Sequence, residues 1–298
     1  MSLNDQGTVL WGYGGFYEVL LPDARITCKL RGLAKSGGQG LYPGDKVKIS
    51  RKPGLPEGMI EEILPRHNQL QRPKIANVEQ AILLFAAKEP KPDFLLLDRM
   101  LVMTAYNHVL PVICINKCDL LSDQEKEELD SRLNPYQEAG FITLFVSALN
   151  KHNIEQLTAV LSGKFSVFAG PSGIGKSSIL NALCPSLGLP VGMISHRLQR
   201  GRHTTRHVKI IQLSDQTLVA DTPGFSLLDL PQELEFRDLT HYYPDFMAVG
   251  PCRFDGCLHD QEPDCAVKAA LAEGIIDHGR YQRYLRLLNE LREREEKY

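Results

Sequence analysis

The sequence lacks the apolar runs of a membrane protein and any strong excess of one charge. No run reaches the roughly 18 apolar residues that a membrane span needs, and the N-terminus lacks the layout of a signal peptide. The net charge of the 298 residues is −2, so contact with a nucleic acid must use local basic patches. We expect no membrane partner, and we expect the protein to be monomeric and, from its cysteine usage, cytoplasmic. The length alone predicts about two domains.

Cysteine is also scarce and unevenly spread, which argues against a disulfide framework. Of the seven cysteines, three crowd into one short segment: Cys252, Cys257 and Cys265. An odd, uneven set in a chain of this length predicts reduced thiols and a metal site. His259 completes a Cys₃His set, which closes the tetrahedron of one structural zinc and leaves no position for water. His241 and His278 lie nearby and are alternatives to His259.

Residues 1–67 have the pattern of a small β-barrel. Short alternating stretches at 16–20, 25–30 and 45–49 are separated by glycine-rich turns, and this even spacing is typical of an OB-like barrel. Basic residues cluster around its long loop: Lys29, Arg31, Lys35, Lys46, Lys48, Arg51 and Lys52. The cluster is consistent with RNA binding. A solvated surface with a slight positive excess is the alternative.

After residue 67, strands and helices alternate, which predicts a doubly wound α/β sheet. The run at 80–86 is apolar after its first residue, Gln80, as in a strand buried in a parallel sheet. Further strands are expected at 110–115 and 141–146. We assign this domain to residues 68–228 and a small, mainly helical, zinc-binding domain to residues 229–298.

The clearest motif is the octapeptide Gly170-Pro171-Ser172-Gly173-Ile174-Gly175-Lys176-Ser177. It fits G-x-x-x-x-G-K-[ST], the loop that wraps nucleotide phosphates. A short apolar strand precedes it, and a helix continues from Ser178. Glycines let the backbone approach an anion. Lys176 is expected to reach the β- and γ-phosphates during catalysis, and the Ser177 hydroxyl to ligate Mg²⁺. A glycine-rich turn that fits by chance is the alternative.

A second motif, Asn116-Lys117-Cys118-Asp119, follows a predicted parallel strand. Asp119 can accept hydrogen bonds from guanine N1 and N2, which adenine cannot supply. Asn116 is expected to steady the loop, and Lys117 to cover the purine ring. Ser147 and Ala148 follow the next strand, where a backbone N–H can reach guanine O6. Together with the phosphate loop, these residues favour GTP over ATP.

Two further segments match the switches of a GTPase. Asp221 and Gly224 belong to Asp-Thr-Pro-Gly after a short strand, where they can contact Mg²⁺ and the γ-phosphate. Thr204 and Thr205 lie upstream in a polar loop, and either one can be the switch ligand. The length of this loop suits a segment that orders around a γ-phosphate.

The position after Asp-Thr-Pro-Gly is occupied by Phe225, where Ras-type enzymes carry a glutamine that orients the attacking water. Intrinsic hydrolysis should therefore be slow unless another group acts. We hypothesise that His203 positions or deprotonates the water when a partner orders its loop. An exposed loop histidine without such a role is the alternative.

The motif order is circularly permuted. Ras-type GTPases run from the phosphate loop through the switches to Asn-Lys-x-Asp, whereas here Asn-Lys-x-Asp precedes the phosphate loop. If the two ends of a Ras-like fold are joined and the chain is reopened upstream of the Asn-Lys-x-Asp strand, the sheet is unchanged. Both switches then directly precede the C-terminal domain.

These segments resemble one family, the circularly permuted bacterial GTPases that depend on the small ribosomal subunit, called RsgA or YjeQ. The likeness spans nearly the whole chain and rests on PGDKV, RPKIANVEQ, NKCDL, GPSGIGKSS, GRHTT, DTPGF and the CxxxxCxH…C tail. It implies GTP contacts at residues 116–119 and 170–178, and zinc at the Cys₃His set. One departure is Arg206, where family members often carry a third threonine.

The resemblance also implies an activity and partners. It implies an OB barrel that binds RNA, hydrolysis of GTP to GDP with Mg²⁺, stimulation by the 30S subunit with its 16S rRNA, and release after late maturation. A nucleotide-gated RNA-binding scaffold, in which slow hydrolysis is incidental, is the alternative function. Hydrolysis of ATP in place of GTP is a third, more remote alternative.

Overall fold

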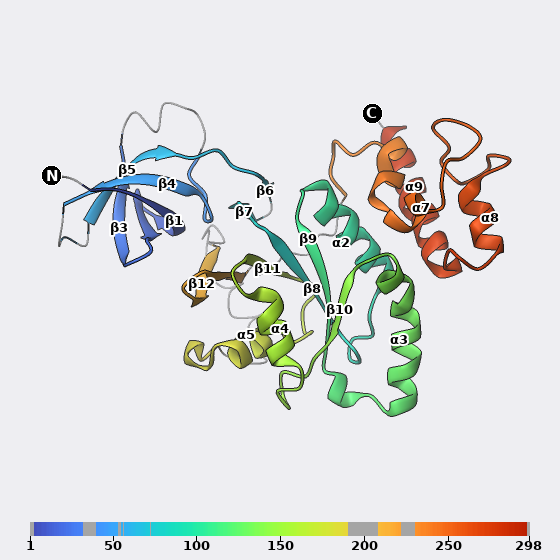
Figure 1. Ribbon diagram of the computed structural model, residues 1–298, viewed down its shortest axis with the longest axis horizontal. Coiled ribbons are helices and arrows are strands. Elements are labelled where there is room, and N and C mark those ends of the chain that lie inside the picture. The colour runs from blue at the N-terminus through green and yellow to red at the C-terminus, as the bar shows by residue number, and fades with distance from the viewer. Residues whose placement is uncertain are drawn as a thin grey trace.

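The computed structural model describes residues 3–31, 40–52, 55, 57–71, 73–189, 208–221 and 230–296. Figure 1 shows a β-barrel on one side, an α/β sheet in the middle and a cluster of helices at the C-terminal end. Within the described residues, no helix is long and apolar enough to cross a membrane.

The N-terminal strands close into a five-stranded barrel with the order β1-β2-β3-β5-β4. They are β1 Leu3–Tyr13, β2 Phe16–Leu20, β3 Arg25–Leu30, β4 Lys46–Arg51 and β5 Glu57–Ile63. Alternate side chains point inward, so that β3 buries Ile26 and Cys28 between exposed neighbours. This confirms the predicted barrel.

The central sheet has six strands in the order β10-β9-β8-β11-β13-β12. The strands are β8 Gln80–Ala86, β9 Leu110–Asn116, β10 Ile142–Phe145, β11 Phe165–Ala169, β12 Lys209–Ser214 and β13 Thr217–Asp221. All neighbouring pairs are parallel except β12 with β13. Every residue of β8 and β11 is buried, as expected for strands covered on both faces.

Helices cover both faces of the sheet. They are α2 Phe94–Tyr106, α3 Asp123–Glu138, α4 Ile154–Leu161 and α5 Lys176–Leu183, with short 3₁₀ turns η1 Cys118–Leu120 and η2 Pro185–Leu187. Leu83 of β8 packs in the cluster with α2 and α3, whereas Ile82 and Leu84 pack in the cluster with α4 and α5. Ser122 caps α3 in the predicted capping box with Glu125.

A short hairpin connects the barrel to the sheet. It consists of β6 Gln69–Gln71 and β7 Lys74–Ala76, which the sequence patterns did not predict. Gly44 of the barrel has φ +88°, and a Cβ there would lie 2.0 Å from the Ala76 carbonyl oxygen. Arg66 binds the fully buried Asp45 with two hydrogen bonds, at 2.6 and 2.8 Å. These contacts fix the barrel against the hairpin that leads into the sheet.

The C-terminal region is helical. It comprises η4 Phe236–Tyr242, α7 Pro244–Ala248, α8 Ala266–Ala272 and α9 His278–Glu295. Its core centres on three packed aromatic rings, Tyr243, Phe246 and Tyr284. Helix α9 packs against α2, so the helical cluster joins the sheet domain on its α2 side.

Candidate nucleotide and metal sites

The phosphate loop lies between β11 and α5, in the predicted strand–turn–helix setting. Gly170 has φ +146°, and a Cβ there would lie 2.2 Å from the Leu84 carbonyl oxygen. Gly175 has φ +94°, and its Cβ would lie 2.3 Å from Nδ2 of Asn116. Only glycine fits these two positions, because each combines a left-handed backbone with a close neighbour.

The lysine and the serine hydroxyl groups that end the phosphate loop lie at the start of α5. Lys176 Nζ donates to the carbonyls of Gly170 and Pro171, at 2.7 Å each, so its ammonium group lies over the loop. Ser177 and Ser178 occupy the first turn of the helix, where backbone N–H groups attract anions. The remaining loop residues, Ser172, Gly173 and Ile174, form the turn between the strand and the helix.

Asn116, the last residue of β9, joins three segments that are distant in sequence. It is 2% exposed. Its Nδ2 donates to the Ile174 carbonyl in the phosphate loop at 2.9 Å, and its Oδ1 accepts from the Ala148 N–H at 3.1 Å. The Asn-Lys-x-Asp motif, the phosphate loop and the Ser-Ala segment therefore meet at one edge of the sheet. This edge is the carboxyl end of the parallel strands, where open α/β sheets bind ligands.

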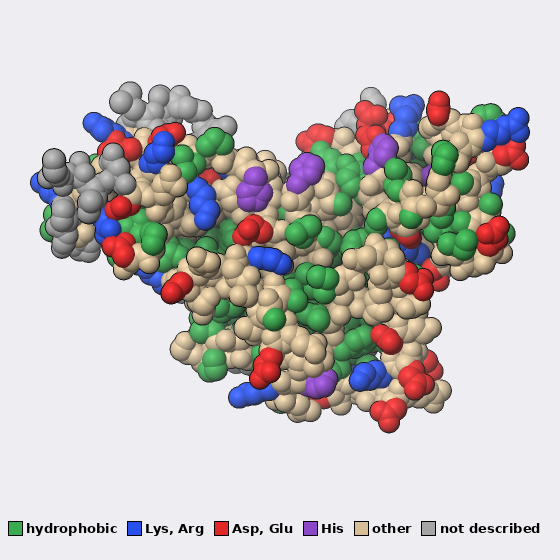
Figure 2. Space-filling view, in the orientation of Figure 1, with side chains coloured by type: hydrophobic (Ala, Val, Ile, Leu, Met, Phe, Trp, Pro, Cys, Tyr) green, Lys and Arg blue, Asp and Glu red, His purple; other side chains and the backbone are tan. Residues whose placement is uncertain are grey.

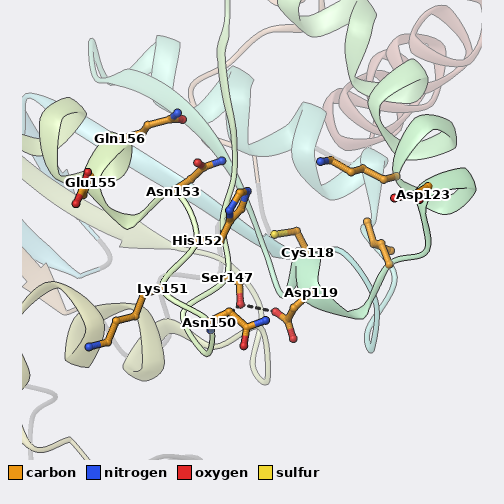
Figure 3. A pocket seen from close by; sticks show the side chains of 12 residues that line it. Cys118, Asp119, Asp123, Ser147, Asn150, Lys151, His152, Asn153, Glu155 and Gln156 are labelled. Atoms are coloured by element: carbon orange, nitrogen blue, oxygen red, sulfur yellow. Dashed lines mark hydrogen bonds between the residues drawn. The ribbon is translucent and has the colours of Figure 1, made fainter.

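Asp119 and Ser147 form a direct pair, which the sequence patterns did not reveal. The Ser147 hydroxyl donates to Oδ1 of Asp119 (Figure 3) and accepts from the Asn150 N–H at 3.1 Å. This leaves the second carboxylate oxygen of Asp119 without a bond to Ser147. The pairing holds the carboxylate in one orientation, as the reading of a base edge requires.

The two middle residues of the motif have separate environments. Lys117 has φ +63°, and its Nζ donates to the Glu89 carbonyl at 2.7 Å. The left-handed backbone at Lys117 turns the chain from β9 into η1 and places Asp119 beside Ser147. Burial, followed by the nearby Asp119 carboxylate, raises the pKa of the Cys118 thiol.

The switch residues are described only in part. The backbone of Asp221 ends β13, next to the end of β11 in the sheet. His203, Thr204, Thr205, Gly224 and Phe225 lie outside the described residues, as does Arg206.

The four predicted zinc ligands lie together in the C-terminal region. Their donor atoms are all within 4.8 Å of one another. Nδ1 of His259 is 3.5 Å from Sγ of Cys252 and 3.3 Å from Sγ of Cys265. The sulfurs of Cys252 and Cys265 are 3.9 Å apart. His241 lies elsewhere, 3.8 Å from Asp238.

These distances fit a tetrahedral zinc ion. Zn–S bonds of about 2.3 Å and Zn–N bonds of about 2.0 Å place two sulfurs roughly 3.8 Å apart, and a sulfur and a nitrogen roughly 3.5 Å apart. Burial lowers the pKa of His259, although Glu262 opposes the shift, and this favours the neutral imidazole that binds metals. The Ala266 N–H, at the start of α8, donates to Cys252 Sγ at 3.3 Å. The cluster is therefore compatible with zinc.

Comparison with known proteins agrees with this geometry. The family model described as RsgA GTPase matches residues 63–231, and the model of the RsgA N-terminal domain matches residues 6–60. The chain belongs to the RsgA GTPase family. A relative from Moorella thermoacetica is 44% identical over 98% of this chain and 99% of its own length, and one from Geobacillus kaustophilus is 43% identical over 98% and 99%. Both are named small ribosomal subunit biogenesis GTPase RsgA.

Two solved structures share the fold over almost the entire chain. YjeQ from Thermotoga maritima has a TM-score of 0.85 and 33% identity, covering 97% of this chain and 99% of that one. YloQ, described as a circularly permuted GTPase, has a TM-score of 0.83 and 34% identity, covering 98% and 96%. The likeness to YloQ confirms the permuted motif order.

Proposed function

We propose that this protein hydrolyses GTP to GDP and phosphate with Mg²⁺, is stimulated by the 30S ribosomal subunit and acts in late maturation of that subunit. Family membership supports a GTPase of small-subunit biogenesis. The observation that carries the assignment of the site is that the Asn116 side chain donates to the phosphate loop and accepts from the Ala148 N–H, which joins the base-reading and phosphate-binding segments.

Each segment of the site then has a role. Asp119 accepts hydrogen bonds from guanine N1 and N2, and Lys117 covers the base. Cys118 forms part of the turn between these two residues. Residues 170–178 wrap the phosphates. Bound Mg²⁺ neutralises charge that develops on the phosphates. Ser177, with Thr204 or Thr205 and with Asp221, would hold that ion, and Lys176 and the Gly224 N–H would contact the γ-phosphate.

The attacking water needs a group other than the missing glutamine at Phe225. We assign this role to His203, which lies beside the threonines of the switch. A partner that orders the loop would bring the imidazole to the water, so hydrolysis would be slow alone and fast on the ribosome.

Each of the three domains also has a proposed role. We assign RNA binding, including 16S rRNA, to the barrel in residues 1–67, GTP hydrolysis to residues 68–228, and a structural zinc to residues 229–298. We further propose that the protein works as a monomer in the cytoplasm.

GTP turnover with 30S subunits, 50S subunits and free rRNA tests this function. We expect stimulation by 30S subunits alone, and unchanged turnover on 30S addition would instead support a nucleotide-gated scaffold. His203→Ala should lose the stimulation while GTP affinity stays intact. Unchanged stimulation in that variant would remove His203 from the mechanism.

A second experiment tests base recognition. Asp119→Asn replaces one acceptor oxygen with a donor, so the variant should reject GTP and accept xanthosine triphosphate, whose position 2 carries an oxygen in place of the amino group. Equal GTP affinity in the wild type and the variant would disprove the role of Asp119.

A further inference from the structure

The outer edge of β10 faces an open groove. Among the described strands, β10 pairs only with β9. The Val146 N–H donates to the Ile115 carbonyl on β9 at 2.8 Å. Because neighbouring residues of a strand alternate in direction, the backbone groups of Phe145 and Thr143 point away from the sheet. The Phe145 carbonyl accordingly accepts from Asn153 Nδ2 at 2.8 Å. Such an edge can pair with one more strand.

The groove along this edge consists of two adjoining cavities, of about 720 and 670 Å³. Thr143, Leu144 and Phe145 line its base, while α3 and the start of α4 form its walls. In Figure 3, Asn153 and Gln156 lie on one side, Cys118, Asp119 and Asp123 lie on the other, and His152 lies between them. No residue of the phosphate loop lines either cavity. The groove is therefore separate from the phosphate-binding loop, and one end of it reaches Asp119 and Ser147 of the base site.

The walls of the groove are acidic. Apart from Asp119, which belongs to the base site, four carboxylates line them against two lysines, Lys126 and Lys151; the carboxylates are Asp123, Glu127, Asp130 and Glu155. Three of the four, at 123, 127 and 130, lie on one face of α3, since their spacing of four and three residues matches the helical repeat. Figure 2 shows acidic side chains gathered over α3. The neighbouring Glu125 pairs with Lys88, but no ion pair is seen for these three carboxylates within the described residues.

We propose that this groove binds an extended segment, rich in lysine and arginine, from a partner protein, which adds to β10 as a further strand. Main-chain hydrogen bonds to Thr143 would supply affinity. Alternate side chains of the segment would reach the carboxylates of α3, which select for positive charge. The same carboxylates would repel the phosphates of a nucleic acid. The bound segment would end beside Asp119 and Ser147, the pair at the base site.

Synthetic peptides of about eight residues, the length of an ordinary strand, test this proposal on the full GDP-bound chain. The probe alternates lysine or arginine with valine and carries a fluorophore. We expect saturable binding that weakens with salt, together with slower amide exchange at Thr143 and Phe145. A glutamate–valine peptide should not bind. A lysine–valine peptide N-methylated at alternate residues should also fail, because it keeps the charge and loses the main-chain donors.

Two variants on α3 separate groove binding from general attraction. Glu127→Lys combined with Asp130→Lys should weaken binding about tenfold or more, since both charges reverse inside the groove. Glu128→Lys combined with Glu138→Lys is the matched control, because both residues are on the same helix, outside the groove, where they accept from Gln124 and Asn134. This control variant reverses the same number of charges and should leave binding within about twofold.

Several outcomes would overturn the proposal. Equal binding of the acidic or the N-methylated peptide would exclude strand addition by a basic segment. Equal loss in the groove variant and in the control variant would show general attraction to an acidic helix. Self-association that protects Thr143 and Phe145 in place of the peptide would identify a second copy as the occupant. Tighter binding of a single-stranded RNA than of the basic peptide would identify a nucleic acid.

Discussion

Nη1 of Arg280 on α9 donates to Oδ1 of Asp98 on α2 at 2.7 Å, and each residue is 1% exposed. Arg280 also binds both carboxylate oxygens of Asp245 on α7, and Arg283 donates to Asp98. Burial alone would lower the pKa of Arg280, but Asp98 and Asp245 outweigh it and raise that pKa. This charged network fixes the helical domain in one position on the sheet domain.

Asp98→Ala should destabilise the protein by about 3–5 kcal/mol, because Arg280 would keep its buried charge after losing a partner. Denaturant unfolding followed by circular dichroism measures the change. The control is Glu290→Ala at the same interface, which breaks the more exposed pair with Arg99 and should cost about 1 kcal/mol or less. Equal losses of unfolding free energy in the two variants would show that the buried Asp98 contributes no more to stability than the exposed Glu290.

Gly175→Ala should reduce the affinities for GTP and GDP alike by about tenfold or more, since its Cβ would displace Asn116 and strain the loop. Binding of fluorescent nucleotides measures this loss. Gly163→Ala is a suitable control, because Gly163 also has a positive φ but its Cβ would meet no atom within 4 Å. That variant should lose stability and keep its nucleotide affinity.

Removal of zinc should unfold the C-terminal region, because the four ligands hold together loops between α7 and α8. We expect about one zinc per chain by metal analysis. Cys265→Ser should lose both the metal and part of the helical signal at 222 nm. Cys184→Ser, outside the cluster, should retain both. Full zinc content in Cys265→Ser would contradict the ligand set.

Glu125 makes the stability of the fold depend on pH. Its hydrogen bond from Lys88, followed by that from the Ser122 N–H, lowers its pKa from 4.5 to about 2. A carboxylate with a lowered pKa stabilises the fold fully above pH 4.5 and loses this contribution as the pH falls towards 2. The stability difference between the wild type and Glu125→Gln should therefore shrink across that window. Glu128→Gln, which removes a carboxylate outside the cap, should show a smaller change over the same pH range.

Much of this structure could be predicted from local patterns. The barrel strands alternate, β8 is apolar after Gln80, and Ser122 and Glu125 have the spacing of a capping box. The phosphate loop and Asn-Lys-x-Asp are contiguous motifs, so short stretches of sequence contain all of their residues. The family resemblance extended these predictions to the whole chain.

The remaining features depend on partners that are distant in sequence. Asn116 meets Ile174 across 58 positions, and Ser147 meets Asp119 across 28. Gly44 is restricted by Ala76 as well as by its own turn. The burial of Asp98 gives no signal in an amphipathic helix, where a lone carboxylate suggests a solvated face. Such contacts follow from the packed fold, and periodicity alone does not contain them.

The network at Asp98 has a consequence for synthesis of the chain. Asp98 and Arg280 are 182 positions apart, so α2 leaves the ribosome long before the cation that neutralises its carboxylate. Until α9 emerges, the face of α2 that bears Asp98 has no partner for its charge and stays hydrated. Docking of the last helix then places the cations of α9 against this carboxylate. A nascent chain that stops before residue 280 would lack this link, so the charged network between the two domains forms only once α9 has been synthesised.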